Sequence, residues 1–310
     1  MARKLRIQYP GAVYHVINRG NYRRDVFETA GAARAFEATL AETCRRYGWR
    51  VHAYVIMRNH YHLALETPRA NLVEGMHWLQ STFATRFNRY RSQNGHLFQG
   101  RYQALLVEDH RALARLVHYI NLNPVRAGVV EAAEVASFRW GSLRHFAGGD
   151  NPSWLTGEVL LSVLNLGDTT SGWKTYAAFL TALAGERNAQ EEMEFDSLCR
   201  GWAIGTAGWR KALAREHSKM ALQSGFEHQE LREIKETRWR DELQRMLGER
   251  GESTEAAHLH AKPAPWKIEM AAELRLRVDA PYRWIAEVLS IARPASLRMQ
   301  IHRRALHVSA

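Results

Sequence analysis

The sequence predicts an α+β protein, with a ferredoxin-like antiparallel sheet in its first half and an all-helical region after it. Two observations support this fold class. Over residues 1–150, strand-like and helix-like patterns follow one another as β-α-β-β-α-β, the order of a split βαβ fold. After residue 150, helical spacing prevails between polar stretches at residues 147–172 and 248–265. We therefore expect three regions, which cover residues 1–150, 151–250 and 251–310.

The elements of the first region follow from spacing and from their end signals. The expected strands cover residues 11–20, 49–57, 60–66 and about 102–108. The expected helices cover residues 31–48, 71–91 and 110–123. The first helix is closed by Gly48 and the third has Asp109 as N-cap; Pro124 predicts an end by Asn123. We expect two helices on one face of the sheet and an open second face.

The charge of the chain indicates a polyanionic partner. Its 310 residues carry a formal net charge of +11, with a pI of about 9.9. Residues 1–150 hold 21 Lys and Arg against 11 Asp and Glu, whereas residues 151–310 are nearly balanced. Lys4 is the only lysine of the first half, and arginine suits contacts to phosphates and bases. Contact with nucleic acid is therefore expected mainly in the first half.

Other sequence features exclude several classes of protein. Cys44 and Cys199 lie far apart and outside any CxxC motif, which argues against a disulfide framework or a zinc knuckle. No apolar run has the length of a signal peptide core or of a membrane span. We expect a cytoplasmic protein without a membrane partner, and DNA binding would associate it with the nucleoid.

Residues 55–68, VIMRNHYHLALETP, place two histidines on one face of the third strand. Successive strand residues point to opposite faces, so His60 and His62 share a face with Glu66. Burial of two imidazoles and a carboxylate would be costly in an ordinary core. Neutral imidazole is a common ligand of divalent metals, and a pair of surface histidines is the alternative. Glu66 is expected at most to support such a site from outside.

The third helix offers a second group of functional side chains. Tyr119 and Asn123 are four residues apart and therefore lie on one helix side, at the border of the apolar stripe. A tyrosine can act as a nucleophile, and an asparagine oxygen can bind Mg²⁺ or Mn²⁺. An amphipathic tyrosine at the edge of the core is the alternative.

These residues carry a resemblance to a known family. RNHYHLAL resembles the HUH motif, two histidines around a hydrophobic residue. HYINLNPVRAG resembles a Y-I-x-x-N-P-V-R-A segment of the REP-associated tyrosine transposases, which are HUH transposases of single-stranded DNA. YHVINRG, HLFQGRYQALLVED and FRWGSLRHF resemble further segments of that family in the right order. The resemblance covers residues 5–150 and departs at Arg58, where the family often has proline.

The resemblance implies a metal-dependent transposase or endonuclease. Such an enzyme cleaves and rejoins single-stranded DNA at hairpin-forming repetitive palindromes through a 5′-phosphotyrosine. Carried over by position, His60, His62 and Asn123 hold Mg²⁺ or Mn²⁺, and Tyr119 attacks the phosphate. The partner would be single-stranded or hairpin DNA. The resemblance leaves a monomer or a homodimer open. Many single-strand transposases of this type are dimers with shared sites, whereas a REP-associated member is expected to act as a monomer, with Tyr119 attacking in cis.

Further residues are candidates for DNA contacts. In the first region they follow the first strand or precede the fourth, where they could meet backbone or bases: Arg19, Arg23, Arg24, Gln99, Arg101 and Tyr102. Residues 282–304 resemble a helix-turn-helix, whose recognition helix would present Arg298, Arg303 and Arg304. Ordinary surface arginines and a plain helical hairpin are the alternatives.

Three rival functions remain open at the level of sequence. The first is a domesticated transposase that binds DNA hairpins after losing its chemistry; the presence of His60, His62, Tyr119 and Asn123 argues against it. The second is a nuclease that activates water, which would need a carboxylate cluster. The third is an RNA-binding module of the same topology, which would need aromatic residues on the face that holds the histidines.

Overall fold

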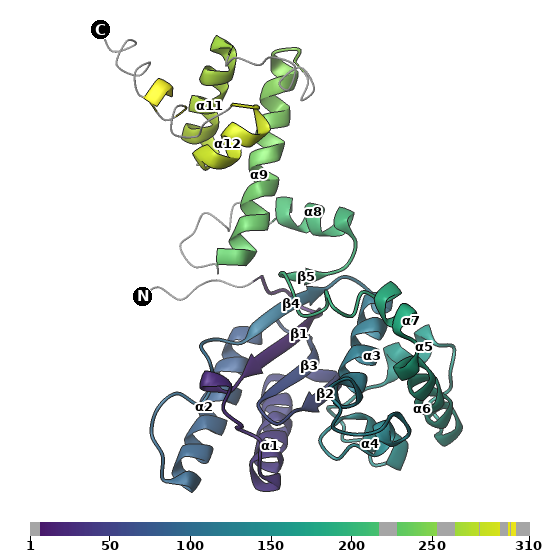
Figure 1. The fold of residues 1–310 in the computed structure, drawn as a ribbon. Helices are drawn as coiled ribbons and strands as arrows, with labels where there is room; N and C mark the ends of the chain where they lie inside the picture. The colour runs from purple at the N-terminus through teal and green to yellow at the C-terminus, as the bar shows by residue number, and fades with distance from the viewer. Residues whose placement is uncertain are drawn as a thin grey trace. The chain divides into compact units, whose positions relative to one another are not determined.

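The computed structural model describes residues 7–216, 228–252, 264–278, 280–291, 297 and 299–301 (Figure 1). The chain divides into two compact units, one of residues 6–206 and one built mainly from residues 207–310. The predicted sheet lies in the first unit. This unit extends past residue 150, so the division of function among residues 1–150, 151–250 and 251–310 stays a prediction.

A five-stranded sheet forms the centre of the first unit, in the order β2-β3-β1-β4-β5. The strands are β1 (Ala12–Arg19), β2 (Arg50–Ile56), β3 (His60–Thr67), β4 (Gln103–Val107) and β5 (Ala203–Ile204). The first four are antiparallel to their neighbours, and this order confirms the ferredoxin-like prediction. The short β5 pairs parallel to β4 at the edge and was not predicted.

Two helices cover one face of the sheet, as predicted. They are α1 (Ala30–Tyr47) and α2 (Leu72–Arg91), which appear together on one side in Figure 1. Tyr61 of β3 points to this side, where its ring centroid lies 4.6 Å from that of Phe36 of α1. Phe83 of α2 completes the aromatic core, 5.2 Å from Phe36. The alternation along β3 therefore directs its neighbours His60 and His62 to the opposite face.

The opposite face is covered, contrary to our prediction of an open surface. Helix α3 (His110–Arg126) packs against β2 and β3 on this side (Figure 1). Asp109 caps the helix as predicted, accepting a hydrogen bond from the Ala112 amide. The predicted end at Asn123 is wrong, because the helix includes Pro124 and runs to Arg126. Pro124 is buried, and packing of the last turn compensates for the hydrogen bond that proline cannot donate.

After α3 the chain continues to build the same unit. It forms η2 (Ala132–Ser137), α4 (Leu143–Gly148), α5 (Glu158–Val163), α6 (Thr170–Gly185) and α7 (Arg187–Glu192) before it enters β5. Helices α5 and α6 pack against α3. His118 of α3 is buried there and bonds to the Tyr176 hydroxyl at 3.1 Å.

The second unit has its own apolar core. Its helices are α8 (Ala207–Glu216), α9 (His228–Glu249), α11 (Pro265–Val278) and α12 (Tyr282–Val288). Trp239 packs on Trp284, and its indole donates a hydrogen bond to the Val278 carbonyl at 3.0 Å. The predicted helix-turn-helix is not confirmed. Its first helix corresponds to α12, but Arg298, Arg303 and Arg304 lie outside the described residues.

None of the helices in the described part of the chain combines the length and apolar composition needed to cross a membrane.

Candidate active site

Three histidines share the face of the sheet that α3 covers. The β1–β3 register pairs Arg19 with His60, Ile17 with His62 and His15 with Ala64, so His15 lies on the same face as the predicted pair. The ring centroids of His60 and His62 are 5.1 Å apart, as are those of His15 and His62. His15 and His62 are buried, and His60 is partly exposed at the edge of the group.

Burial determines the charge of these histidines. Loss of solvation lowers the pKa of His15 and of His60 to about 4. The pKa of His62 is also well below its usual value, first because of burial and then because His15 and His60 are close. At neutral pH all three rings are therefore neutral, which is the form that binds metals.

Tyr119 of α3 faces the histidines. Its ring centroid is 5.7 Å from that of His62 and 6.0 Å from that of His15, with edge-on geometry in both cases. The Tyr119 hydroxyl and the Cys199 thiol are hydrogen-bonded at 3.0 Å. Burial, reinforced by Cys199, raises the pKa of Tyr119 above its usual value. The phenol is therefore protonated at neutral pH and needs help to act as a nucleophile.

The cover over Tyr119 comes from residues 194–202, which link α7 to β5 and are here called the covering segment. The Phe195 ring lies edge-on to Tyr119 at 5.7 Å, and the Leu198 carbonyl accepts a hydrogen bond from His15 Nδ1 at 2.8 Å. Two ion pairs join the segment to α3: Arg115 to Glu194 at 2.9 Å, and Arg126 to Asp196 at 3.0 Å. Both pairs are largely exposed, so each contributes at most about 1 kcal/mol.

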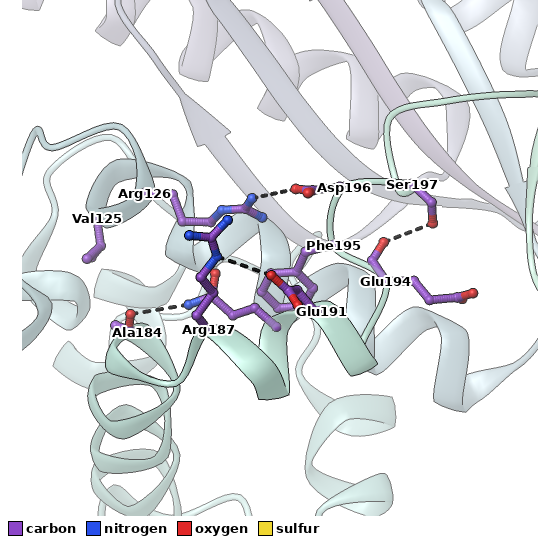
Figure 2. A pocket seen from close by; sticks show the side chains of 10 residues that line it. Val125, Arg126, Ala184, Arg187, Glu191, Glu194, Phe195, Asp196 and Ser197 are labelled. Carbon is purple, nitrogen blue, oxygen red and sulfur yellow. Dashed lines mark hydrogen bonds and ion pairs between the residues drawn. The ribbon is translucent and has the colours of Figure 1, made fainter.

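An open pocket of about 640 Å³ lies beside the covering segment. Figure 2 shows Arg126 extended along it toward Asp196, and Arg187 turned to Glu191 at 3.1 Å. The Arg126 guanidinium also lies 5.3 Å from the Tyr119 ring centroid. Because carboxylates pair with both arginines, the pocket presents no uncompensated positive charge as it stands.

The donor atoms of the site fit a divalent cation. His60 Nδ1 bonds to the Asn59 side-chain oxygen at 2.7 Å, and His62 Nδ1 bonds to His15 Nε2 at 2.9 Å. Among the described residues, neither the Nε2 of His60 nor that of His62 has a hydrogen-bond partner. A pair of imidazole nitrogens on one strand face matches the ligands expected of a divalent metal site.

A second donor group overlaps the first. Ligand atoms of His15, His62 and Cys199 lie within 4.8 Å of one another, a set that would suit a softer ion such as Zn²⁺. Asn123, the third ligand implied by the resemblance, donates from Nδ2 to the Tyr119 carbonyl at 3.4 Å, which leaves its oxygen available. In the described part of the chain, no hydrogen bond joins Asn123 to either histidine.

The candidate DNA-contacting residues of the first region gather at one edge of the site. The Gln99 amide donates to the Arg19 carbonyl at 2.8 Å, so the loop after β1 and the loop before β4 lie side by side. Arg19, Arg23, Arg24, Gln99 and Arg101 are all exposed there. Tyr102 is only 6% exposed, unlike these residues, and its contact with DNA stays a prediction.

The residues predicted from the sequence to be functional did not include Cys199, Phe195 or Tyr22. Cys199 and Phe195 lie about 80 positions after Tyr119, and the lone cysteine has no motif around it. Tyr22 is 93% exposed between the loop arginines and has positive φ, as has Arg23. An aromatic followed by two arginines in a polar loop is a pattern that could have drawn attention to Tyr22.

Comparison with known proteins agrees with the resemblance seen in the sequence. Residues 8–123 match the family model described as "Transposase IS200 like". A Haemophilus influenzae protein named provisionally as a REP-associated tyrosine transposase is 26% identical over 110 residues; the match covers 32% of this chain and 62% of that protein. The solved structure of a REP-associated tyrosine transposase bound to a REP hairpin aligns with 18% identity and a TM-score of 0.39, over 51% of this chain and 93% of that one.

The family match covers β1 to β4 and α3 as far as Asn123, so it includes His15, His60, His62, Tyr119 and Asn123 but ends before the covering segment. Residues 8–123 of this chain are accordingly similar to the IS200-like transposases.

Proposed function

We propose that this protein cleaves and rejoins single-stranded DNA at hairpin-forming repetitive palindromes, with Tyr119 as nucleophile and His60, His62 and Asn123 as ligands of Mg²⁺ or Mn²⁺. The observation that supports it best is the distance of 5.7 Å between the rings of Tyr119 and His62, which come from different elements and meet on one face of the sheet. The relative of known structure was solved with a REP hairpin, which suggests the same class of substrate here.

The proposed chemistry is a transesterification. The Tyr119 oxygen would bond to the scissile phosphorus while the bond to the 3′-oxygen breaks, and the phenolic proton is transferred, in net, to the departing 3′-hydroxyl. The cation, when bound, would withdraw charge from a non-bridging phosphate oxygen. The 5′-phosphotyrosine retains a phosphodiester, so another 3′-hydroxyl can reverse the reaction and join strands without ATP.

Access to the nucleophile requires movement of the covering segment. The Tyr119 hydroxyl bonds to Cys199, and Phe195 packs on its ring, so a phosphate must displace part of this contact before attack. Arg115 and Arg126 would then exchange the carboxylates of Glu194 and Asp196 for DNA phosphates, which accept the same charge-assisted hydrogen bonds.

A covalent adduct is the test of this function. Labelled hairpin oligonucleotides from repeats that flank the gene are incubated with the protein and Mn²⁺ or Mg²⁺, and separated on a denaturing protein gel. We expect a shifted, labelled band that disappears in Tyr119→Phe and in EDTA. Tyr90→Phe is the matched control, because Tyr90 is 84% exposed on α2 and remote from the histidines in the fold; it should leave the band unchanged.

A hairpin-binding protein without chemistry is the second candidate. The observation in its favour is the covered tyrosine, whose raised pKa and thiol partner hold it in an unreactive state. Tight binding of the hairpins with no adduct in either metal would establish this alternative and refute the nuclease for those substrates.

A further inference from the structure

A chain of hydrogen bonds runs from the covering segment to the proposed metal ligand. The Leu198 carbonyl lies 2.8 Å from Nδ1 of His15, and Nε2 of His15 lies 2.9 Å from Nδ1 of His62. His15 is completely buried, and its two nitrogens are both used in this chain. In each of these hydrogen bonds, one atom can be identified as the donor and the other as the acceptor.

The donors and acceptors of these two hydrogen bonds are determined by the Leu198 carbonyl. A carbonyl oxygen only accepts, so His15 Nδ1 carries the hydrogen. His15 is completely buried and its Nδ1 contacts a neutral carbonyl, so the ring is a neutral imidazole with one N–H, and its Nε2 holds a lone pair and accepts. The donor to that lone pair is Nδ1–H of His62. The remaining nitrogen of His62, Nε2, therefore keeps its lone pair and can bind a cation.

His60 is held in the same Nδ1–H tautomer by a different hydrogen bond. The Asn59 amide group donates from Nδ2 to the Arg23 carbonyl at 3.3 Å, which directs its oxygen toward His60. That oxygen accepts from Nδ1–H of His60 at 2.7 Å, so Nε2 of His60 also keeps its lone pair. Two independent hydrogen bonds thus leave a lone pair on the Nε2 atom of both His60 and His62.

We propose that His15 is a positioning residue, which holds His62 in the Nδ1–H tautomer and so presents Nε2 of His62 to the divalent cation. The proposal rests on the proposed metal role of His60 and His62. Hydrogen-bond partners of metal-binding histidines commonly fix ring orientation and tautomer in this way, and their loss costs roughly 10-fold to 100-fold in metal affinity.

The tautomers can be measured directly in the full-length, metal-free protein. Nuclear magnetic resonance of protein with ¹⁵N-labelled histidine rings reports which nitrogen of each ring is protonated. A nitrogen–nitrogen coupling across an N–H···N bond identifies the His15–His62 pair without a variant. We expect the coupling to join the protonated Nδ1 of His62 to the unprotonated Nε2 of His15. The Nδ1 of His15 should be protonated as well. The opposite direction, with His15 Nε2 as donor, would overturn the proposal.

Calorimetric titration with Mn²⁺ measures the consequence. His15→Phe should weaken binding by about 10-fold to 100-fold. His15→Gln should stay within a few-fold of wild type, because its amide can accept from His62 and donate to Leu198. His118→Phe is the matched control, since His118 is also buried but bonds to Tyr176; it should not change the affinity. Equal loss in His15→Gln and His15→Phe, both folded, would contradict positioning by hydrogen bonds.

A cobalt titration separates positioning from ligation. If His15, His62 and Cys199 held the ion together, Co²⁺ would give a thiolate charge-transfer band that Cys199→Ser abolishes, and the positioning role would be wrong. We expect no such band. If the tautomers and metal affinities are as proposed but no DNA adduct forms, then the nuclease proposal fails while the role of His15 stands.

Discussion

Buried histidines make this fold sensitive to acid, and His118 allows the effect to be isolated. Burial lowers its pKa from 6.5 to about 4. Between these values the unfolded chain holds a proton that the folded chain lacks. Protonation of this residue in the unfolded chain therefore does not reduce the free energy of unfolding above pH 6.5. It reduces that free energy progressively as the pH falls toward 4.

We predict that His118→Gln reduces the loss of unfolding free energy between pH 7 and pH 4.5 by about 2–3 kcal/mol. Urea unfolding at the two pH values measures it, with each protein compared with itself. His96→Gln, which removes an exposed histidine, should keep the wild-type dependence. An unchanged pH dependence in His118→Gln would show that the burial of this ring costs the protonated state little.

The shared faces of the candidate site residues could be predicted from the sequence, because their spacing is local, whereas their expected roles come from the family resemblance. Strand alternation placed His60 and His62 on one face, and helical spacing placed Tyr119 beside Asn123. His15 could not be assigned to the group in this way, because its position depends on the β1–β3 register, which no single segment encodes. The burial of Tyr102 could not be predicted, because the sequence at the end of a strand does not show whether an aromatic side chain points outward.

At the scale of elements, the contact between α2 and the start of β2 depends on a glycine. A Cβ atom added at Gly75 would lie 2.0 Å from the Trp49 ring, which is buried and fixed by a hydrogen bond from its indole to Asn71. An added methyl group would therefore overlap the ring, so the helix needs a residue without a side chain here.

Gly75→Ala should therefore destabilise the protein by about 1–3 kcal/mol, although alanine is the better helix former by about 1 kcal/mol. Thermal unfolding measures the change. Gly31→Ala in α1 is the control, because a Cβ there meets nothing within 4 Å; it should be neutral or slightly stabilising. A Gly75→Ala protein as stable as wild type would mean that Trp49 can reorient.

The covering segment is the element whose motion should limit access to Tyr119. We predict that Glu194→Gln combined with Asp196→Asn, which removes both ion pairs to α3, increases amide hydrogen exchange of residues 194–199 by up to about 5-fold for each pair. The rate of adduct formation should rise with it.

Glu191→Gln provides the control for that experiment. It breaks the pair with Arg187 inside α7 but removes no contact between the segment and α3. Exchange of residues 194–199 and the adduct rate should then match wild type. Faster exchange without faster adduct formation in the double variant would show that another step limits the reaction.

The limits of the sequence prediction differ between elements. The strands and helices up to residue 107 lie within one or two residues of their predicted ends, since each has strong alternation, a cap or a closing glycine. The end of α3 was misplaced because tertiary packing overrode the effect of Pro124. The prediction of an open face was wrong because the sequence does not show on which side of the sheet α3 packs, and because the covering segment has no periodic pattern.

At the scale of the whole molecule, every group in the candidate site belongs to the first unit. We predict that a protein ending at Thr206 unfolds cooperatively and forms the Tyr119 adduct in the same yield per molecule as the full chain. Calorimetry and the gel assay measure these two properties. A folded fragment that forms no adduct would mean that residues 207–310 contribute to the reaction itself.

The order of the chain also determines when the site is completed during synthesis. Tyr119 and the histidines leave the ribosome first, and the covering segment and β5 follow about 80 residues later. At about 5–20 residues per second, this delay is roughly 4–16 s. During that interval the nascent chain carries a sheet face and a tyrosine without their cover. The growing protein thus passes through a stage in which its nucleophile is more accessible than it will be in the finished molecule.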